Sequence, residues 1–180
     1  KFWVFDGYNQ ELVFYDFVND HGPGADNHSD GRIHRYSEVI LNKTANPSHM
    51  VLDQDKKWLY IVDGTYKRIL RVDITTGSKK GNLGLINEPL AEHWEMHGIT
   101  QEIFVETGLD KPVGIEITGD RLFVSDYGTG DIVCYSISSK SEIGRINTGK
   151  PGIMGIKIGP AGKLWYVNAD DHELFRVEPR

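Results

Sequence analysis

Residues Pro112–Ser136 read PVGIEITGDRLFVSDYGTGDIVCYS, and this stretch decides the fold of the chain. Apolar and polar residues alternate through three short runs, which predicts three β-strands. The runs are separated by turns rich in Gly and Asp, and the second turn begins at Asp126. We therefore expect a tight hairpin with one strand ending at Asp126 and another following it.

The hairpin at Asp126 is one of four copies, so the chain carries an internal repeat. The same pattern recurs at Asp6, Asp63 and Asn168, and we call these three residues and Asp126 the anchors. Four residues before each anchor stands Phe or Leu, and six residues after it stands Leu or Ile. Three residues before each anchor stands an aromatic side chain, expected to pack between repeats: Trp3, Tyr60, Phe123 and Trp165.

Each repeat predicts the four short antiparallel strands of a β-propeller blade, and the fold class is all-β. The spacing of 42 residues between Asp126 and Asn168 fits a blade. Inner strands are expected ahead of three hairpins, over His49–Asp53, Gly114–Thr118 and Gly155–Gly159. Outer strands are expected over Ile33–Val39, Glu102–Thr107 and Ile143–Asn147. The blade units are then residues 1–39, 47–107, 112–147 and 153–180.

Two segments of the sequence resemble repeats of known families. Pro112–Ser136 resembles an NHL repeat, and GIKIGPAGKLWYVNADDHELFRVEP (residues 155–179) is similar to the related repeats of virginiamycin B lyase. The resemblance implies an NHL-type propeller, typically six-bladed, whose inner strands line a central channel. About three and a half blades are present, and an open arc would expose strand edges. We expect the remaining blades to come from the rest of the chain or from a second chain.

Two inserts interrupt the regular spacing, over residues 19–31 and 78–101. The first is rich in Gly, Asp and Asn and predicts an irregular loop. In the second, Pro89 and Gly98 predict a short helix over about 89–97. The inserts carry His21, His28, His93 and His97, which are candidate metal ligands on one face.

A helix would place the last two of these histidines, four residues apart, on one side in a geometry suited to zinc. Calcium is the alternative for the acidic first insert, although its spacing does not match an EF-hand. The histidines could equally be ordinary surface residues.

A second candidate site lies at the predicted channel. His49 occupies the inner-strand position that Gly114 and Gly155 hold in later blades, and Tyr8 lies in the first hairpin. An imidazole that binds a metal beside a phenol that moves a proton would form a lyase or hydrolase site. The alternative for His49 is a channel histidine that is hydrogen-bonded to backbone or water.

The segments that carry this second site have a narrower resemblance. VFDGYNQELVFYD (Val4–Asp16), followed by NPSHMVLD (Asn46–Asp53), resembles peptidylglycine α-hydroxyglycine α-amidating lyase. In that family zinc is bound by inner-strand histidines, a hairpin tyrosine takes part in proton transfer, and calcium is structural. The resemblance implies His49 as one zinc ligand and Tyr8 as the tyrosine. The chain departs from the family at Asn9, where a cysteine is usual, and at the two later glycines.

Composition excludes some classes of function. The net charge is −6 and the Lys and Arg residues are scattered, so no nucleic-acid partner is expected. No apolar run approaches the roughly 18 residues of a membrane-spanning helix. Sequons at Asn27 and Asn42 permit an extracellular or periplasmic location.

Three functions are consistent with these patterns. The first is a metal-assisted lyase or hydrolase that acts on a small polar substrate or peptide at the channel mouth. The second is a non-catalytic secreted or periplasmic scaffold that binds a protein or metal on its insert face. The third is a sugar-lactone hydrolase that would need carboxylate ligands such as Glu116 and Asp53.

Overall fold

The computed structural model describes residues 1–19, 21–24, 27–41, 48–55, 57–84, 86 and 89–178. The sequon at Asn42 lies outside these residues. Within them the chain forms strands β1 to β16 and a single 3-10 turn at Pro160–Gly162, so the all-β prediction is confirmed. No helix in the described segments is long and apolar enough to cross a membrane.

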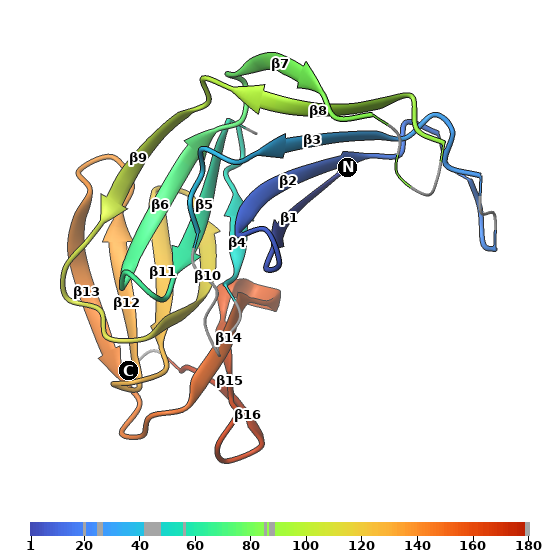
Figure 1. Ribbon diagram of the computed structural model, residues 1–180. Coiled ribbons are helices and arrows are strands. Elements are labelled where there is room, and N and C mark those ends of the chain that lie inside the picture. The colour runs from blue at the N-terminus through green and yellow to red at the C-terminus, as the bar shows by residue number, and fades with distance from the viewer. Residues whose placement is uncertain are drawn as a thin grey trace. The chain divides into compact units, whose positions relative to one another are not determined.

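The strands form four small sheets, which we call blades 1 to 4 (Figure 1). In spatial order, blade 1 contains β1 (Phe2–Asp6), β2 (Glu11–Asp16), β3 (Arg32–Tyr36), β8 (Glu92–His97) and β7 (Ser78–Asn82). Blade 2 contains β4 (Met50–Leu52), β5 (Trp58–Asp63), β6 (Arg68–Asp73) and β9 (Thr100–Val105). Blade 3 contains β10 (Pro112–Thr118), β11 (Arg121–Asp126), β12 (Asp131–Ser136) and β13 (Ser141–Asn147). Blade 4 contains β14 (Ile153–Ile158), β15 (Leu164–Asn168) and β16 (Glu173–Arg176).

The chain divides into two compact units. The first, Lys1–Lys43 with Ile74–Thr100, contains blade 1. The second, Thr44–Asp73 with Gln101–Arg180, contains blades 2 to 4.

All four predicted hairpins form, and all four have the same register. Each anchor pairs with the residue five positions later, as in Asp6 with Glu11 and Asp126 with Asp131. Asp63 pairs with Arg68, and Asn168 pairs with Glu173. The common register follows from the common turn length, because an antiparallel pairing is fixed by the turn that joins its strands.

The predicted helix over residues 89–97 is wrong, because this segment contains β8. That strand runs parallel to β3, with Ile33 opposite His93, and antiparallel to β7 (Figure 1). Pro89 and Gly98 flank the element, but they fit the ends of a strand as well as those of a helix. The second insert thus extends blade 1 by two strands, and tertiary pairing overrides the local pattern.

The blades of the second unit pack face to face around shared apolar cores. Tyr60, Val62 and Ile69 of blade 2 pack with Leu122 and Val124 of blade 3. One blade further on, Ile132 of blade 3 packs with Ile153, Ile156 and Leu164 of blade 4. The aromatic positions before the anchors contribute to both cores through Tyr60 and Phe123. Stacked antiparallel sheets of this kind are the packing of propeller blades.

Candidate functional site

Each hairpin turn is held by its own anchor side chain. The Oδ1 atoms of Asp6, Asp126 and Asn168 each accept two hydrogen bonds from backbone N–H groups two and three residues later, at 3.0–3.2 Å. The fourth residue after every anchor has a positive φ, between 54° and 74°: Gln10, Lys67, Gly130 and His172. The four turns therefore share one backbone conformation although their sequences differ.

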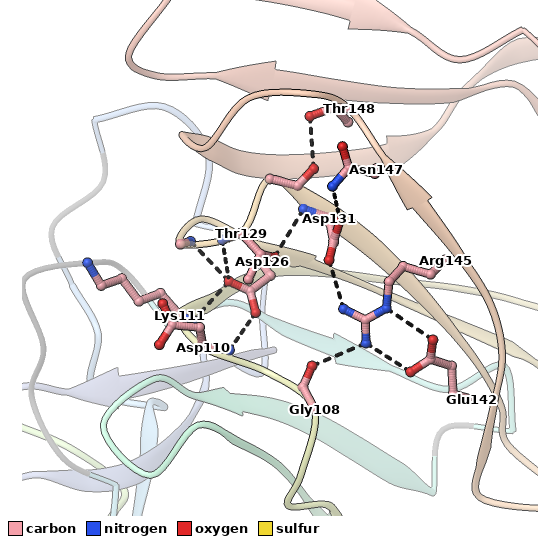
Figure 2. A network of polar contacts seen from close by, with 12 residues as sticks. Gly108, Asp110, Lys111, Asp126, Thr129, Asp131, Glu142, Arg145, Asn147 and Thr148 are labelled. Atoms are coloured by element: carbon pink, nitrogen blue, oxygen red, sulfur yellow. Dashed lines mark hydrogen bonds and ion pairs between the residues drawn. The ribbon is translucent and has the colours of Figure 1, made fainter.

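Asp126 also fastens its hairpin to the chain that leads into β10 (Figure 2). Its buried carboxylate accepts hydrogen bonds from Asp110 N at 2.6 Å and Lys111 N at 3.0 Å. The turn of blade 3 and the start of its inner strand consequently lie on the same rim. A buried carboxylate with this many backbone donors is a structural clamp, because buried polar groups are stable only when paired.

A second polar network lies beside this clamp (Figure 2). Asp131 accepts hydrogen bonds from Arg145 at 2.8 Å and Asn147 at 2.7 Å, and Arg145 also pairs with Glu142. Although burial opposes the shift, these hydrogen bonds hold the pKa of Asp131 below its usual range. Glu142 and Asp131 together raise the pKa of Arg145. The network ties β12 to β13 through ionised groups that are already paired.

Tyr8, the predicted acid/base, lies in the turn of blade 1, and its side chain is 93 % exposed. It belongs to the first unit, whereas His49 belongs to the second. The joint site proposed for these two residues therefore stays a prediction.

His49 lies against an inner strand of the second unit. It directly precedes β4, and its backbone carbonyl accepts a hydrogen bond from Val62 N at 3.0 Å. Its Cε1 atom lies 4.0 Å from the position that a Cβ on Gly155 of β14 would occupy. The side chain is half-buried, and burial lowers the pKa of its imidazole. The neutral form, which can accept a proton or bind a metal, is thereby favoured.

This lowered pKa predicts a pH dependence of stability. Below about pH 6.5 the unfolded chain takes up a proton at His49 before the folded chain does, so the free energy of unfolding falls as the pH is lowered towards the folded pKa. Urea unfolding measures the free energy of unfolding at pH 7.5 and at pH 5.5. The decrease between these two pH values should be smaller in His49→Gln than in the wild type. The control, His97→Gln at an exposed position, should keep the wild-type loss. Equal losses in all three proteins would contradict the prediction.

The structure separates two of the predicted insert ligands. His93 and His97 lie four residues apart on β8, which places them about 13 Å apart along a strand instead of one helical turn apart. His93 is buried, with Nδ1 2.9 Å from the Gly84 carbonyl oxygen and Nε2 3.3 Å from Arg35 Nε. Since Arg35 can only donate, Nε2 accepts and Nδ1–H donates to the carbonyl. This hydrogen-bonding pattern leaves His93 no free lone pair for a metal.

The other two insert histidines lie in the loop between β2 and β3. His21 Nε2 is 2.8 Å from Asp30 Oδ1, and Asn19 donates to the other carboxylate oxygen at 2.7 and 3.1 Å. The rings of His21 and His28 are 5.9 Å apart, and Phe17 lies 5.3 Å from His28. Asp30 thus holds Asn19 and His21 together. The neighbouring acidic residues Asp20 and Asp26 lie outside the described residues.

In the part of the chain that the structure describes, no three His, Cys, Asp or Glu side chains are grouped as a metal ion would require. The two carboxylates considered as ligands for a lactonase metal already accept hydrogen bonds within the chain. Glu116 pairs with Lys157 at 2.9 and 3.0 Å, and Asp53 accepts a hydrogen bond from Lys57 N at 2.8 Å.

A small open hollow lies on the hairpin rim of blade 4 and was not predicted from the sequence. Its volume is about 160 Å³, and it is lined by Thr148, Lys150, Tyr166, Asn168, Asp171, Glu173 and Phe175. The Tyr166 and Phe175 rings stack 5.0 Å apart. Blade 3 has Val124 and Val133 at the positions of these two rings. The change from aliphatic to aromatic residues was the available sequence signal.

Comparisons with known proteins bear on the fold. No protein-family model and no curated protein sequence matches the chain. A solved structure of luciferin-regenerating enzyme is similar, with 14 % identity and a TM-score of 0.54 over 94 % of this chain and 58 % of that one. A nidogen/laminin complex structure is also similar, with 17 % identity and a TM-score of 0.51 over 97 % and 59 %. The chain thus spans less than two thirds of either neighbour, and these likenesses support the propeller fold alone.

Proposed function

We propose that the chain is a binding scaffold of the NHL propeller type, which holds a basic side chain of a partner protein in the hollow of blade 4. The observation that carries the proposal is the charge of this hollow. Asp171 is neutralised by Lys150 at 3.1 Å, while Glu173 is exposed and adds a second carboxylate. The lining therefore has an excess negative charge.

The shape and aromatic content of the hollow favour the same ligand. A volume of about 160 Å³ suits a single lysine or arginine side chain. The partly exposed rings of Tyr166 and Phe175 can contribute cation–π attraction, on the order of 0.5–1 kcal/mol at such sites. A protein partner on a propeller rim accords with a secreted or periplasmic location, which we propose with it.

A pair of short peptides tests this function. We expect a peptide with a central arginine to bind, and the same peptide with citrulline, which lacks the charge, to bind about tenfold more weakly. Glu173→Gln should weaken arginine-peptide binding to a similar extent, measured by calorimetry at low salt. The control variant Glu106→Gln changes an exposed carboxylate outside the hollow and should bind as the wild type does. Equal binding of both peptides, or unchanged binding by Glu173→Gln, would contradict the proposal.

A second candidate function is a metal-assisted lyase or hydrolase at the channel mouth. The observation that favours it is the half-buried imidazole of His49 beside Gly155; burial lowers the pKa of this imidazole. In this proposal His49 is one zinc ligand, and Tyr8 donates or accepts a proton. Zinc would supply Lewis acidity towards a substrate oxygen.

Elemental analysis separates the two functions. If the lyase proposal holds, the wild type retains about one equivalent of zinc and His49→Ala loses it, since three protein ligands hold a catalytic zinc and one would be removed. The same measurement reports calcium, which we propose for the acidic first insert. An identical zinc content in both proteins would rule out His49 as a ligand.

A further inference from the structure

The chain that connects blade 3 to blade 4 carries Lys150 on a backbone that is held on both sides. Thr148 N donates to the Gly130 carbonyl oxygen at 3.0 Å, and Gly152 N donates to the Tyr127 carbonyl oxygen at 2.9 Å. The Lys150 carbonyl oxygen lies only 2.0 Å from the position that a Cβ on Gly130 would occupy. The backbone of this segment is thus fixed by close packing, whereas the Lys150 side chain is 68 % exposed.

The ion-pair partner of Lys150 belongs to the wall of the hollow in blade 4. Asp171 N donates to Asn168 Oδ1 at 3.0 Å, so the hairpin turn fixes the backbone from which this carboxylate projects. Lys150 Nζ lies 3.1 and 3.2 Å from the two carboxylate oxygens. The Asp171 side chain is only 26 % exposed. The carboxylate is therefore built into the site, whereas the ammonium reaches it on a flexible four-carbon stem.

An ion pair of the same kind lies outside the hollow. Lys67 in the turn of blade 2 pairs at 2.8 Å with Asp110, which lies in the chain that leads into blade 3. Like Lys150, Lys67 has a side chain that is more than half exposed and joins a hairpin turn to a connection between blades. Neither Lys67 nor Asp110 lines the hollow. This pair therefore serves as a reference for Lys150 and Asp171.

We infer that Lys150 is an internal competitor for the basic side chain of the partner protein. In the free protein its ammonium occupies the carboxylate of Asp171, to which the incoming cation would bind, and binding displaces the ammonium into solvent. The inference rests on the proposed function, because it concerns the same hollow. It adds a residue that lowers the affinity of the site by holding one of its two carboxylates.

The chemistry of the two groups allows this exchange. An ion pair between partly exposed side chains is weak, because water and salt screen it and the long side chain loses conformational freedom. Once the ammonium has left, Asp171 and Glu173 both line the hollow as unpaired carboxylates. A guanidinium can donate two parallel hydrogen bonds to a carboxylate, whereas an ammonium binds as a point charge. An arginine side chain is therefore the cation best suited to replace Lys150.

Calorimetry with the arginine peptide at low salt tests the inference. Lys150→Gln should bind the peptide about fivefold more tightly than the wild type, because no tethered ammonium has to be displaced. The matched control Lys67→Gln removes the same charge from the reference ion pair and should bind as the wild type does. When Asp171→Asn is already present, adding Lys150→Gln should change the affinity by less than about twofold, since the competing contact is absent. Circular dichroism checks that each variant is folded.

The outcomes distinguish this inference from the proposed function. Equal binding of the arginine and citrulline peptides by the wild type would remove the proposed function and the inference with it. Preferred binding of the arginine peptide, together with unchanged or weaker binding by Lys150→Gln, would leave the proposed function standing and overturn the inference. A gain in Lys67→Gln as large as that in Lys150→Gln would also overturn it, because the effect would then come from net charge.

Discussion

Replacing Gly114 with alanine is expected to lower the free energy of unfolding by about 3 kcal/mol. A Cβ at this position of β10 would lie 2.3 Å from the Met154 carbonyl oxygen and 2.6 Å from Ser125 Oγ. Ser125 is itself fixed there, because its hydroxyl accepts a hydrogen bond from Gly114 N and donates one to the Met154 carbonyl oxygen. The methyl group could be accommodated only if inner strand β14 moved away.

Urea unfolding followed by tryptophan fluorescence measures this effect. The matched control is Gly144→Ala in β13 of the same blade, where no atom lies within 4 Å of the added Cβ. This change should alter the free energy of unfolding by less than about 1 kcal/mol. A similar small effect from Gly114→Ala would show that β10 and β14 approach each other less closely than described.

Replacing Asp126 with asparagine is expected to lower the free energy of unfolding by about 2–4 kcal/mol. The carboxylate accepts four backbone hydrogen bonds, and an amide of the same shape would direct its NH₂ group at N–H donors. At least one buried donor would then lose its partner. The surface variant Asp171→Asn removes only an exposed ion pair with Lys150 and should cost less than about 1 kcal/mol.

The reciprocal change tests the same reasoning in blade 4. The anchor there is Asn168, whose Nδ2 donates to the Pro151 carbonyl oxygen at 2.9 Å. An aspartate could not donate to this carbonyl oxygen, and proline has no N–H that could donate to the aspartate instead. Asn168→Asp would therefore place a carboxylate oxygen against a carbonyl oxygen, and it should also lower the free energy of unfolding. Both stabilities are read from urea unfolding at pH 7. If either substitution leaves the free energy of unfolding unchanged, the stability of that turn does not depend on whether its anchor is a carboxylate or an amide.

The sequence by itself determined the repeat. The four anchors, the strands on either side of them and the inner and outer strands of blades 2 and 3 all lie close to their predicted positions. Local chemistry explains this success. An anchor side chain bonds to N–H groups two or three residues away, and strand alternation needs only neighbouring residues.

Only the tertiary structure decided the second insert and the details of the candidate sites. Nine residues around Trp94 suited a helix or a strand, and the choice depended on β3, about sixty residues earlier, whose backbone groups pair with β8. The buried environment of His93 likewise depends on Arg35 and Gly84. The hollow of blade 4 requires Thr148 and Lys150 to meet β15 and β16. Contacts between residues far apart in the chain leave no periodic signal in it, so they could not be predicted from the sequence.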